Sequence, residues 1–367
     1  MIYKDFGRTG KKVSAIGFGG MRFKSEEYKK DDAICAKLIL DAHAKGVTYF
    51  DTGPGYCDDH SEAIMGEAFK SMNYGDFYIS TKCGLWQAKD ADGARRMIEK
   101  SIKRLNVPKI TFYNMWCIMN LGEYRKMTAK GGMYDGILKA KEEGLVEHIC
   151  CTVHTNGEET AEIVRDGRVE GLTLGYNAIN FAYRRAGVTA ASDAKMGVVV
   201  MNPLGGGTIP KHAEHFKFLA NGDPRGVAVA ALRFLVAQKE VTVALVGVTS
   251  FDEIDEMLTA SEDLPVVDEN YLTALSGKLG LELDTLCTGC SYCDKCPSGV
   301  PIPKLVESYN EAVLSGGDIK ETINRIKYHW NISPDLAKKC TECGECERLC
   351  TQKLPIIERL RRIAAAE

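Results

Sequence analysis

The chain has 367 residues, of which 45% are hydrophobic and 26% charged, and its formal net charge is -3. This composition is typical of a folded globular protein, and the near-neutral charge excludes the basic surface that nucleic-acid binding requires. The apolar runs are of strand length, and the N-terminal segment lacks the apolar core of a signal peptide. We therefore expect no membrane association, a cytoplasmic location and reduced thiols. The sequence leaves the oligomeric state open.

The first 260 residues alternate strand-like and helix-like segments. Eight such units over about 250 residues predict an α/β fold, a (β/α)8 TIM barrel rather than an open doubly wound sheet. The Rossmann glycine fingerprint is incomplete, because Arg22 stands where its third glycine should be. Residues 1–14 predict a hairpin that turns at 7–10 and covers the barrel floor. The predicted strands are 13–19, 47–51, 77–82, 110–116, 147–153, 172–177, 197–203 and 241–247.

Eight of the fourteen cysteines lie in two tight groups near the C-terminus. In a reducing compartment such groups predict metal ligands rather than disulfides. The second group has the C-x2-C-x2-C-x3-C spacing of bacterial ferredoxins, and the first is one residue shorter before its last cysteine. These spacings favour two [4Fe-4S] clusters over zinc, whose sites normally join two C-x2-C pairs across a longer gap. The groups are Cys287, Cys290, Cys293 and Cys296, and Cys340, Cys343, Cys346 and Cys350.

The fourth cysteine of such a run usually binds the other cluster. We therefore assign Cys350 to the cluster of the first three cysteines, and Cys296 to the cluster of Cys340, Cys343 and Cys346. The residue after Cys350 is a threonine, where proline is usual. We predict two domains, a barrel over 1–275 and a small ferredoxin-like iron–sulfur domain over 276–367. Few apolar residues separate the cysteines, so we expect this second domain to fold around its metal.

Residues at the carboxyl ends of barrel strands face the active-site mouth. Asp51 and Lys82 end the second and third predicted strands, and Tyr56 lies in the loop after Asp51. A tyrosine donates a proton near neutral pH only when its phenolate is stabilised, and an ammonium held by a carboxylate could do so. The alternative is a structural Asp–Lys pair with a tyrosine packed over it, and spacing alone does not decide between the two.

Four segments, residues 3–23, 46–69, 80–84 and 197–207, resemble the aldo-keto reductases, and the terminal domain resembles the ferredoxin-like extension of one branch of that family. The resemblance implies an oxidoreductase in which a tyrosine gives a proton to a carbonyl that receives hydride from NAD(P)H. It places Asp51, Tyr56 and Lys82 in three roles of the family's Asp–Tyr–Lys–His tetrad.

The histidine of that tetrad is replaced by Trp116 at the end of the fourth predicted strand. Indole has one N–H donor and no titratable proton, so Trp116 could hydrogen-bond a substrate oxygen but could not relay protons. His154, at the end of the next strand, is a candidate substitute, although a structural role is its plainer interpretation. Four cysteines near strand ends at the mouth are interpreted as small buried apolar residues: Cys83, Cys117, Cys150 and Cys151.

The resemblance also implies a dinucleotide site. The glycine run after "MNPL" could admit a pyrophosphate or could begin a flexible loop. Ser250 and Glu253 fit a helix capping box, and the four carboxylates between residues 252 and 256 would repel a 2'-phosphate. A bound dinucleotide is therefore expected to be NAD(H) rather than NADP. The expected contacts are Gly205, Gly206, Gly207, Thr152, Thr173, Thr249 and Ser250.

Together these features predict an iron–sulfur oxidoreductase of aldo-keto reductase type. It would reduce a small organic carbonyl or unsaturated substrate with NAD(H), or with electrons passed through two [4Fe-4S] clusters from a ferredoxin or other redox partner. A nicotinamide transfers two electrons and a cluster one, and no flavin motif that would split the pair is visible. The alternative is an electron carrier or redox sensor whose barrel is a non-catalytic docking platform. The presence of Asp51, Tyr56 and Lys82 argues against that alternative.

Overall fold

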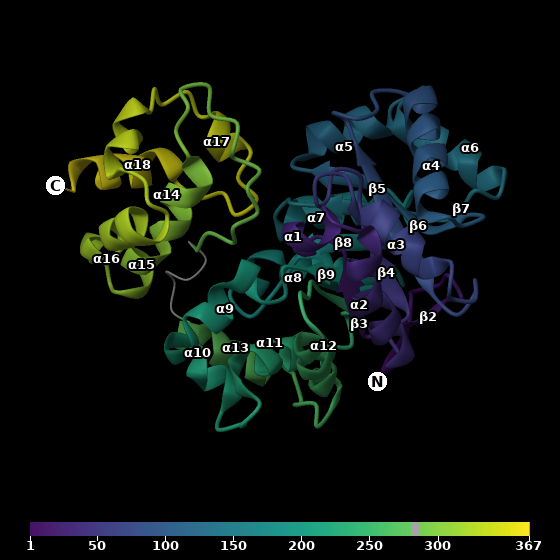
Figure 1. Cartoon of the computed structure of the whole chain (residues 1–367), viewed down its shortest axis with the longest axis horizontal. Coiled ribbons are helices and arrows are strands. Elements are labelled where there is room, and N and C mark those ends of the chain that lie inside the picture. The colour runs from purple at the N-terminus through teal and green to yellow at the C-terminus, as the bar shows by residue number, and fades with distance from the viewer. Residues whose placement is uncertain (280–285, 367) are drawn as a thin grey trace. The chain divides into compact units, whose positions relative to one another are not determined.

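The computed structural model describes residues 1–279 and 286–366. Contacts between residues divide the chain into two compact units. The first comprises Met1–Pro203 and Leu219–Asp268, and the second comprises Leu204–Phe218 and Glu269–Glu367. Figure 1 shows the strands and most of the helices of the first unit in purple to green and the last helices of the second in yellow.

The first unit is a closed barrel of parallel strands in the order β10-β3-β4-β5-β6-β7-β8-β9. The predicted (β/α)8 barrel is therefore confirmed, and each predicted strand overlaps one that is observed. The seven-residue run predicted as the first strand divides at Ala15, because its first half pairs with the N-terminal strand and its second half with β4 and β10. The barrel strands are β3 (Ile16–Gly19), β4 (Tyr49–Asp51), β5 (Tyr78–Gly84), β6 (Ile110–Ile118), β7 (Val146–Val153), β8 (Gly171–Gly175), β9 (Gly197–Met201) and β10 (Val243–Val246).

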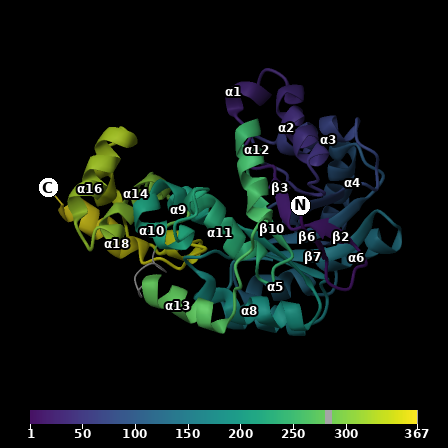
Figure 2. The same ribbon diagram turned by 90° about the horizontal axis from the view of Figure 1, so that it is seen from below.

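Helices cover the outside of these strands (Figure 1 and Figure 2). In α4, for example, Ala94, Ile98 and Leu105 are buried at helical spacing, and the Asp90 carboxylate caps the first turn by accepting the Gly93 N–H. The helices of this unit are α1 (Ser25–Tyr28), α2 (Asp32–Ala44), α3 (Ser61–Phe69), α4 (Ala91–Leu105), α5 (Leu121–Thr128), α6 (Met133–Glu142), α7 (Gly157–Arg165), α8 (Phe181–Asp193), α11 (Gly226–Val236), α12 (Phe251–Leu258) and η2 (Thr259–Ser261).

The predicted N-terminal hairpin is present and closes the floor of the barrel. Strands β1 (Tyr3–Asp5) and β2 (Lys12–Ser14) pair antiparallel. Phe6 follows β1, is 1% exposed, and stacks on Phe112 of β6 with ring centroids 4.0 Å apart. Gly197 leaves room for this ring, because a Cβ there would lie 2.2 Å from it. Phe6 therefore fills the amino end of the barrel.

The second unit is helical and has its own hydrophobic core. Helices α14, α16 and α18 lie side by side in both views (Figure 1 and Figure 2). The core includes Ile302, Leu305, Ile326, Ile356 and Leu360, so this unit has an apolar core in addition to its cysteine loops. Its elements are η1 (Gly205–Gly207), α9 (Thr208–Lys211), α10 (Ala213–Ala220, whose end belongs to the first unit), α13 (Glu269–Leu279), α14 (Ile302–Ser308), α15 (Asn310–Leu314), α16 (Ile319–Asn324), η4 (Arg325–His329), η5 (Pro334–Lys339), α17 (Glu345–Arg348) and α18 (Ile356–Ala365). Within residues 1–279 and 286–366, no helix is both long enough and apolar enough to cross a membrane.

Candidate functional site

Three predicted catalytic side chains meet at the carboxyl ends of β4 and β5. The Lys82 ammonium donates to Asp51 Oδ1 at 2.6 Å and to Tyr56 Oη at 3.3 Å. Asp51 and Lys82 are buried, at 4% and 3% exposed, whereas Tyr56 is half-buried. A buried pair of opposite charges is costly to separate, so Lys82 is held in place under the phenol.

Burial sets the charge states of this group. It raises the pKa of Tyr56, even though the positive charge of Lys82 acts in the opposite direction. Burial alone would lower the pKa of Lys82, but the negative charge of Asp51 and the hydrogen bonds to Asp51 and Tyr56 outweigh it and raise that pKa. At neutral pH the site therefore holds a protonated phenol beside a charged ammonium. The ammonium is in position to stabilise a phenolate when the phenol gives up its proton.

Two polar residues behind Asp51 were not anticipated from the sequence. Ser80 Oγ donates to Asp51 Oδ2 at 2.8 Å, and Asn114 Nδ2 donates to Ser80 Oγ at 3.0 Å. All three side chains are buried, so the second oxygen of Asp51 is satisfied and its orientation is fixed. The available signal was periodicity, because Ser80 lies two residues before Lys82 and so on the same face of β5.

Trp116 lies beside Tyr56, with its ring edge-on at a centroid distance of 5.5 Å. The Lys82 ammonium lies 4.9 Å from the Tyr56 ring centroid and 5.9 Å from that of Trp116. Trp86, which was not predicted from the sequence, packs on Trp116 with ring centroids 4.8 Å apart and is 55% exposed. Trp116 does not end its strand, because β6 continues to Ile118 through an irregular step at Cys117, whose φ is 64°. Aromatic rings thus wall one side of the Tyr56 hydroxyl.

The loop that presents Tyr56 is held in a strained conformation. Cys57, Asp58 and Asp59 follow one another with φ of 53°, 54° and 74°. Each left-handed residue of this kind costs about 1 kcal/mol. The Asp59 carboxylate accepts the Gly55 N–H at 2.8 Å and pairs with both terminal nitrogens of Arg104, one of them at 2.7 Å. These bonds close the loop and offset its strain.

Arg104 also connects this loop to the strand of Lys82. It reaches Glu62 at 3.5 Å, and Glu62 accepts the Thr81 hydroxyl at 2.8 Å, next to Lys82 in the chain. Glu62 is 1% exposed, and burial raises its pKa although its hydrogen bonds and Arg104 act against this. The hydrogen bonds that Asp59 accepts from Arg104 lower the pKa of Asp59 to about 2. One guanidinium therefore ties the Tyr56 loop and the Lys82 strand together.

The residues proposed for a dinucleotide belong to both compact units. Thr152 and Thr173 face each other across β7 and β8, and Thr152 Oγ1 accepts the Cys117 N–H at 2.7 Å. Ser250 Oγ accepts the Glu253 N–H at 3.3 Å, and the Glu253 carboxylate accepts the Thr249 N–H at 2.6 Å, so this pair begins α12. The three glycines form the turn η1, which belongs to the second unit.

The four cysteines predicted near the mouth are all buried, but two of them do not face it. Cys150 packs with Phe6 in the floor layer, and the Cys83 thiol contacts the Met133 sulfur on α6, outside the barrel. Burial raises the pKa of Cys83 and of Cys151 to about 12. His154 follows β7, is 4% exposed, and donates its backbone N–H to the Ile118 carbonyl at 2.8 Å.

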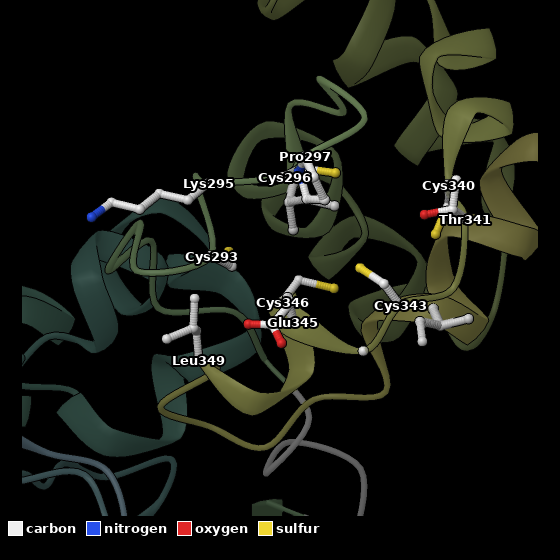
Figure 3. Close-up of a pocket in the computed structure, with 13 residues that line it drawn as sticks. Cys293, Lys295, Cys296, Pro297, Cys340, Thr341, Cys343, Glu345, Cys346 and Leu349 are labelled. Atoms are coloured by element: carbon white, nitrogen blue, oxygen red, sulfur yellow. The ribbon is translucent and has the colours of Figure 1, made fainter. Parts of the chain in front are cut away.

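The eight clustered cysteines line two cavities of the second unit. One, with about 340 Å³ of space partly open to solvent, is lined by Cys287, Cys290, Cys293 and Cys350. The other, of about 370 Å³, is lined by Cys296, Cys340, Cys343 and Cys346, with Cys293 at its edge. Figure 3 shows the thiols of these last four turned toward one space, while Cys293 lies to one side. Each run thus lends its fourth cysteine to the other run's cavity.

These residues fit [4Fe-4S] clusters. Each cavity offers four thiols, the usual ligand set of such a cluster. Backbone N–H groups already point at the sulfurs, from Gly289 to Cys287 at 3.5 Å, from Leu354 to Cys350 at 3.4 Å and from Glu342 to Cys340 at 3.4 Å. Among the residues the structure describes, no three His, Cys, Asp or Glu side chains are grouped closely enough to hold a single metal ion.

The barrel, its Asp–Tyr–Lys group and the two cysteine cavities define an oxidoreductase with an iron–sulfur domain. Sequence comparison agrees. The profile of the aldo/keto reductase family matches residues 15–274, and that of the 4Fe-4S dicluster domain matches residues 286–354. The chain belongs to the aldo/keto reductase family.

Similar proteins are found among sequences and solved structures. L-galactose dehydrogenase of Arabidopsis thaliana is 24% identical over 286 residues, which is 71% of this chain and 88% of that protein. NADH-specific methylglyoxal reductase of Escherichia coli (strain K12) is 31% identical over 123 residues, 29% of this chain and 36% of that protein. An aldo-keto reductase from Klebsiella pneumoniae in complex with NADPH has a TM-score of 0.61 at 17% identity, covering 75% of this chain and 94% of that one. At this identity the structure shows a shared fold alone.

Proposed function

We propose that the chain reduces a small organic carbonyl or unsaturated substrate at the mouth of its barrel. The observation that carries this proposal is the contact of Tyr56 with the buried Lys82–Asp51 pair. The Tyr56 hydroxyl hydrogen-bonds the substrate and gives its proton as negative charge develops there. Lys82 stabilises the phenolate that remains, and Asp51 holds Lys82 in place. Trp116 and Trp86 provide an apolar wall for the substrate.

Two [4Fe-4S] clusters, when bound, supply one-electron transfer. Their ligands differ in exposure. Cys287, Cys293 and Cys350 are 9%, 9% and 7% exposed, whereas Cys343 is exposed. A ferredoxin-type partner can therefore approach the chain most closely on the side of Cys343, and we propose this side as its contact.

NAD(H) is the other candidate electron source. One relative is named as NADH-specific, and one structural neighbour was solved with NADPH. In this chain Asp252 and Glu253 lie in the first turn of α12, where they would repel a 2'-phosphate. We therefore propose NAD(H) rather than NADP wherever a dinucleotide is used.

The catalytic assignment is tested by Tyr56→Phe, with Tyr74→Phe as its control. Tyr74 is 41% exposed and its hydroxyl donates to a backbone carbonyl at 3.3 Å. A panel of small carbonyl and unsaturated compounds is offered with NADH and, separately, with chemically reduced ferredoxin. We expect Tyr56→Phe to lower kcat by about 100-fold or more, as loss of a general acid does, and Tyr74→Phe to leave it unchanged. Activity of Tyr56→Phe within about twofold of wild type would overturn the assignment.

Anaerobic stopped-flow mixing distinguishes the two donors. Oxidation of NADH by substrate at catalytic rates, with the visible absorption of the clusters unchanged, would assign the electrons to the nicotinamide. Turnover with reduced ferredoxin, accompanied by bleaching of that absorption, would assign them to the route through the second unit.

A further inference from the structure

The segment after β9 follows the seventh strand of the barrel. In TIM barrels the loops after the seventh and eighth strands frequently hold phosphate. Here residues 204–218 belong to the compact unit that contains the cysteine cavities. The glycine turn proposed above for a pyrophosphate is therefore part of the iron–sulfur unit.

Gly206 is in direct backbone contact with the first cysteine loop. Its φ is +69°, and a Cβ there would lie 1.8 Å from the carbonyl oxygen of Thr288 and 2.6 Å from its carbonyl carbon. Thr288 follows Cys287 and lines the first cavity. Gly207 has a φ of +96°, yet no atom lies within 4 Å of where its Cβ would be. Of these two glycines, Gly206 is the one at which a neighbouring residue leaves no room for a side chain.

The residues after the turn add a hydrogen bond and an ion pair. Thr208 Oγ1 donates to the Cys287 carbonyl at 3.4 Å. The Asn310 side chain makes two hydrogen bonds to the backbone of Cys287: it donates to the carbonyl at 2.9 Å and accepts the N–H at 2.8 Å. Lys211 pairs with Glu307 of α14 at 2.8 Å. The backbone of Cys287 is therefore held from two sides.

We infer that residues 204–211 form a seat for the ligand loop of the first cluster, and that the glycine turn serves this loop instead of a dinucleotide phosphate while the loop is docked. The carbonyl of Thr288 fills the space against Gly206 that a phosphate would otherwise approach. Retention of the first cluster should then depend on the absence of a side chain at residue 206. This inference concerns cluster binding and does not rest on the proposed substrate chemistry.

The test compares Gly206→Ala with Gly207→Ala in full-length protein purified anaerobically. Both substitutions place a methyl group on a left-handed residue, but only the first collides with Thr288. We expect Gly206→Ala to contain about half the iron of wild type, four atoms instead of eight, with half the visible absorption. Gly207→Ala should match wild type. Equal iron content in the two variants, whether high or low, would overturn the inference.

A second pair of variants leaves the turn intact and so guards against misfolding. Lys211→Met removes the ion pair with Glu307, whereas Lys217→Met removes a pair with Glu214 of its own helix. We expect several-fold faster release of iron to a chelator from Lys211→Met and an unchanged rate from Lys217→Met, and equal rates would count against the seat. NADH titration followed by fluorescence adds a third measurement. Weaker NADH binding in both glycine variants, with unchanged iron, would show that the turn is a phosphate cradle.

Discussion

Lys82 contacts two residues with different roles: Asp51, which holds it in place, and Tyr56, the proposed proton donor. Its ammonium contacts Asp51 at 2.6 Å and Tyr56 at 3.3 Å. Asp51 is the last residue of β4, and Lys82 lies near the end of β5, which continues to Gly84. Strand-end position predicted this group from the sequence. Sequence did not predict Arg104, because its link to Tyr56 passes through Asp59, and the left-handed run that brings Asp59 there is stabilised by the ion pair itself.

A double substitution separates the two roles of Lys82. Lys82→Met alone leaves the Asp51 carboxylate buried without its cation and should destabilise the barrel by about 3 kcal/mol or more. Asp51→Asn/Lys82→Met removes both charges and should recover most of that stability, since replacing a buried pair is often nearly neutral. Activity should stay lost in both variants if Lys82 serves Tyr56. Urea denaturation and kcat are measured together, and recovery of kcat in the double variant would leave the pair a structural role only.

The Arg104→Met substitution should make the free energy of unfolding less dependent on pH in the acid range. Asp59 has a folded-state pKa of about 2, below the ordinary value of 3.8, so its contribution is complete above pH 5 and is lost as pH falls from about 4 to about 2. The carboxylate is 42% exposed, so solvent screening limits the contribution to about 1 kcal/mol. The difference in Tm between wild type and Arg104→Met should therefore shrink on acidification. A constant difference between pH 7 and pH 3 would contradict this. Arg96→Met, at an exposed position of the same helix, is the control.

At the scale of elements, alternation of strand-like and helix-like runs was sufficient to predict the barrel. The alternation did not predict the residues at which each strand begins and ends, because these depend on which neighbouring strands supply hydrogen bonds. The run 13–19 is one apolar segment in sequence, yet β2 pairs in the hairpin and β3 in the barrel. Residues 204–218 likewise follow a barrel strand in sequence but belong to the compact unit that contains the cysteine loops. No local sequence pattern indicates this membership.

Phe6 is the residue of the hairpin on which the barrel floor depends. Phe6→Ala empties a site that is 1% exposed and should cost about 3–5 kcal/mol in free energy of unfolding. Tyr3→Ala, on the same hairpin, removes a ring that is 42% exposed and should cost less than about 1 kcal/mol. Urea denaturation of both variants checks the difference. Similar losses would mean that Phe6 does not fill the floor.

At the scale of the whole molecule, the two units differ in what holds them together. The barrel is closed by hydrogen bonds between strands, and the second unit has an apolar core between α14 and α18. The cysteine loop 286–299 contains neither helix nor strand. The sequence spacing predicted the ligands, but it could not show that helices pack beside them. Metal dependence is therefore expected of the loops rather than of the entire second unit.

Removal of iron should expose the loop 286–299 to protease while the barrel stays folded. Limited proteolysis with and without a chelator, read by mass spectrometry, should give cleavage within this loop only after chelation. Circular dichroism should show most of the helix content unchanged. Equal resistance of the loop with and without iron, or stoichiometric zinc in a colourless preparation, would contradict the prediction.

Cys83 and Cys151 are buried in the barrel and provide an internal reference for measuring how fully the two cysteine cavities are loaded with clusters. Alkylating reagents attack thiolates, and burial holds the pKa of Cys83 and Cys151 near 12, so these thiols should stay unmodified in the folded protein. Cysteines bound to iron are protected by coordination until the metal leaves. Differential isotope labelling should then report the occupancy of each cavity separately, cysteine by cysteine, in unfractionated cell extract where colour cannot be measured.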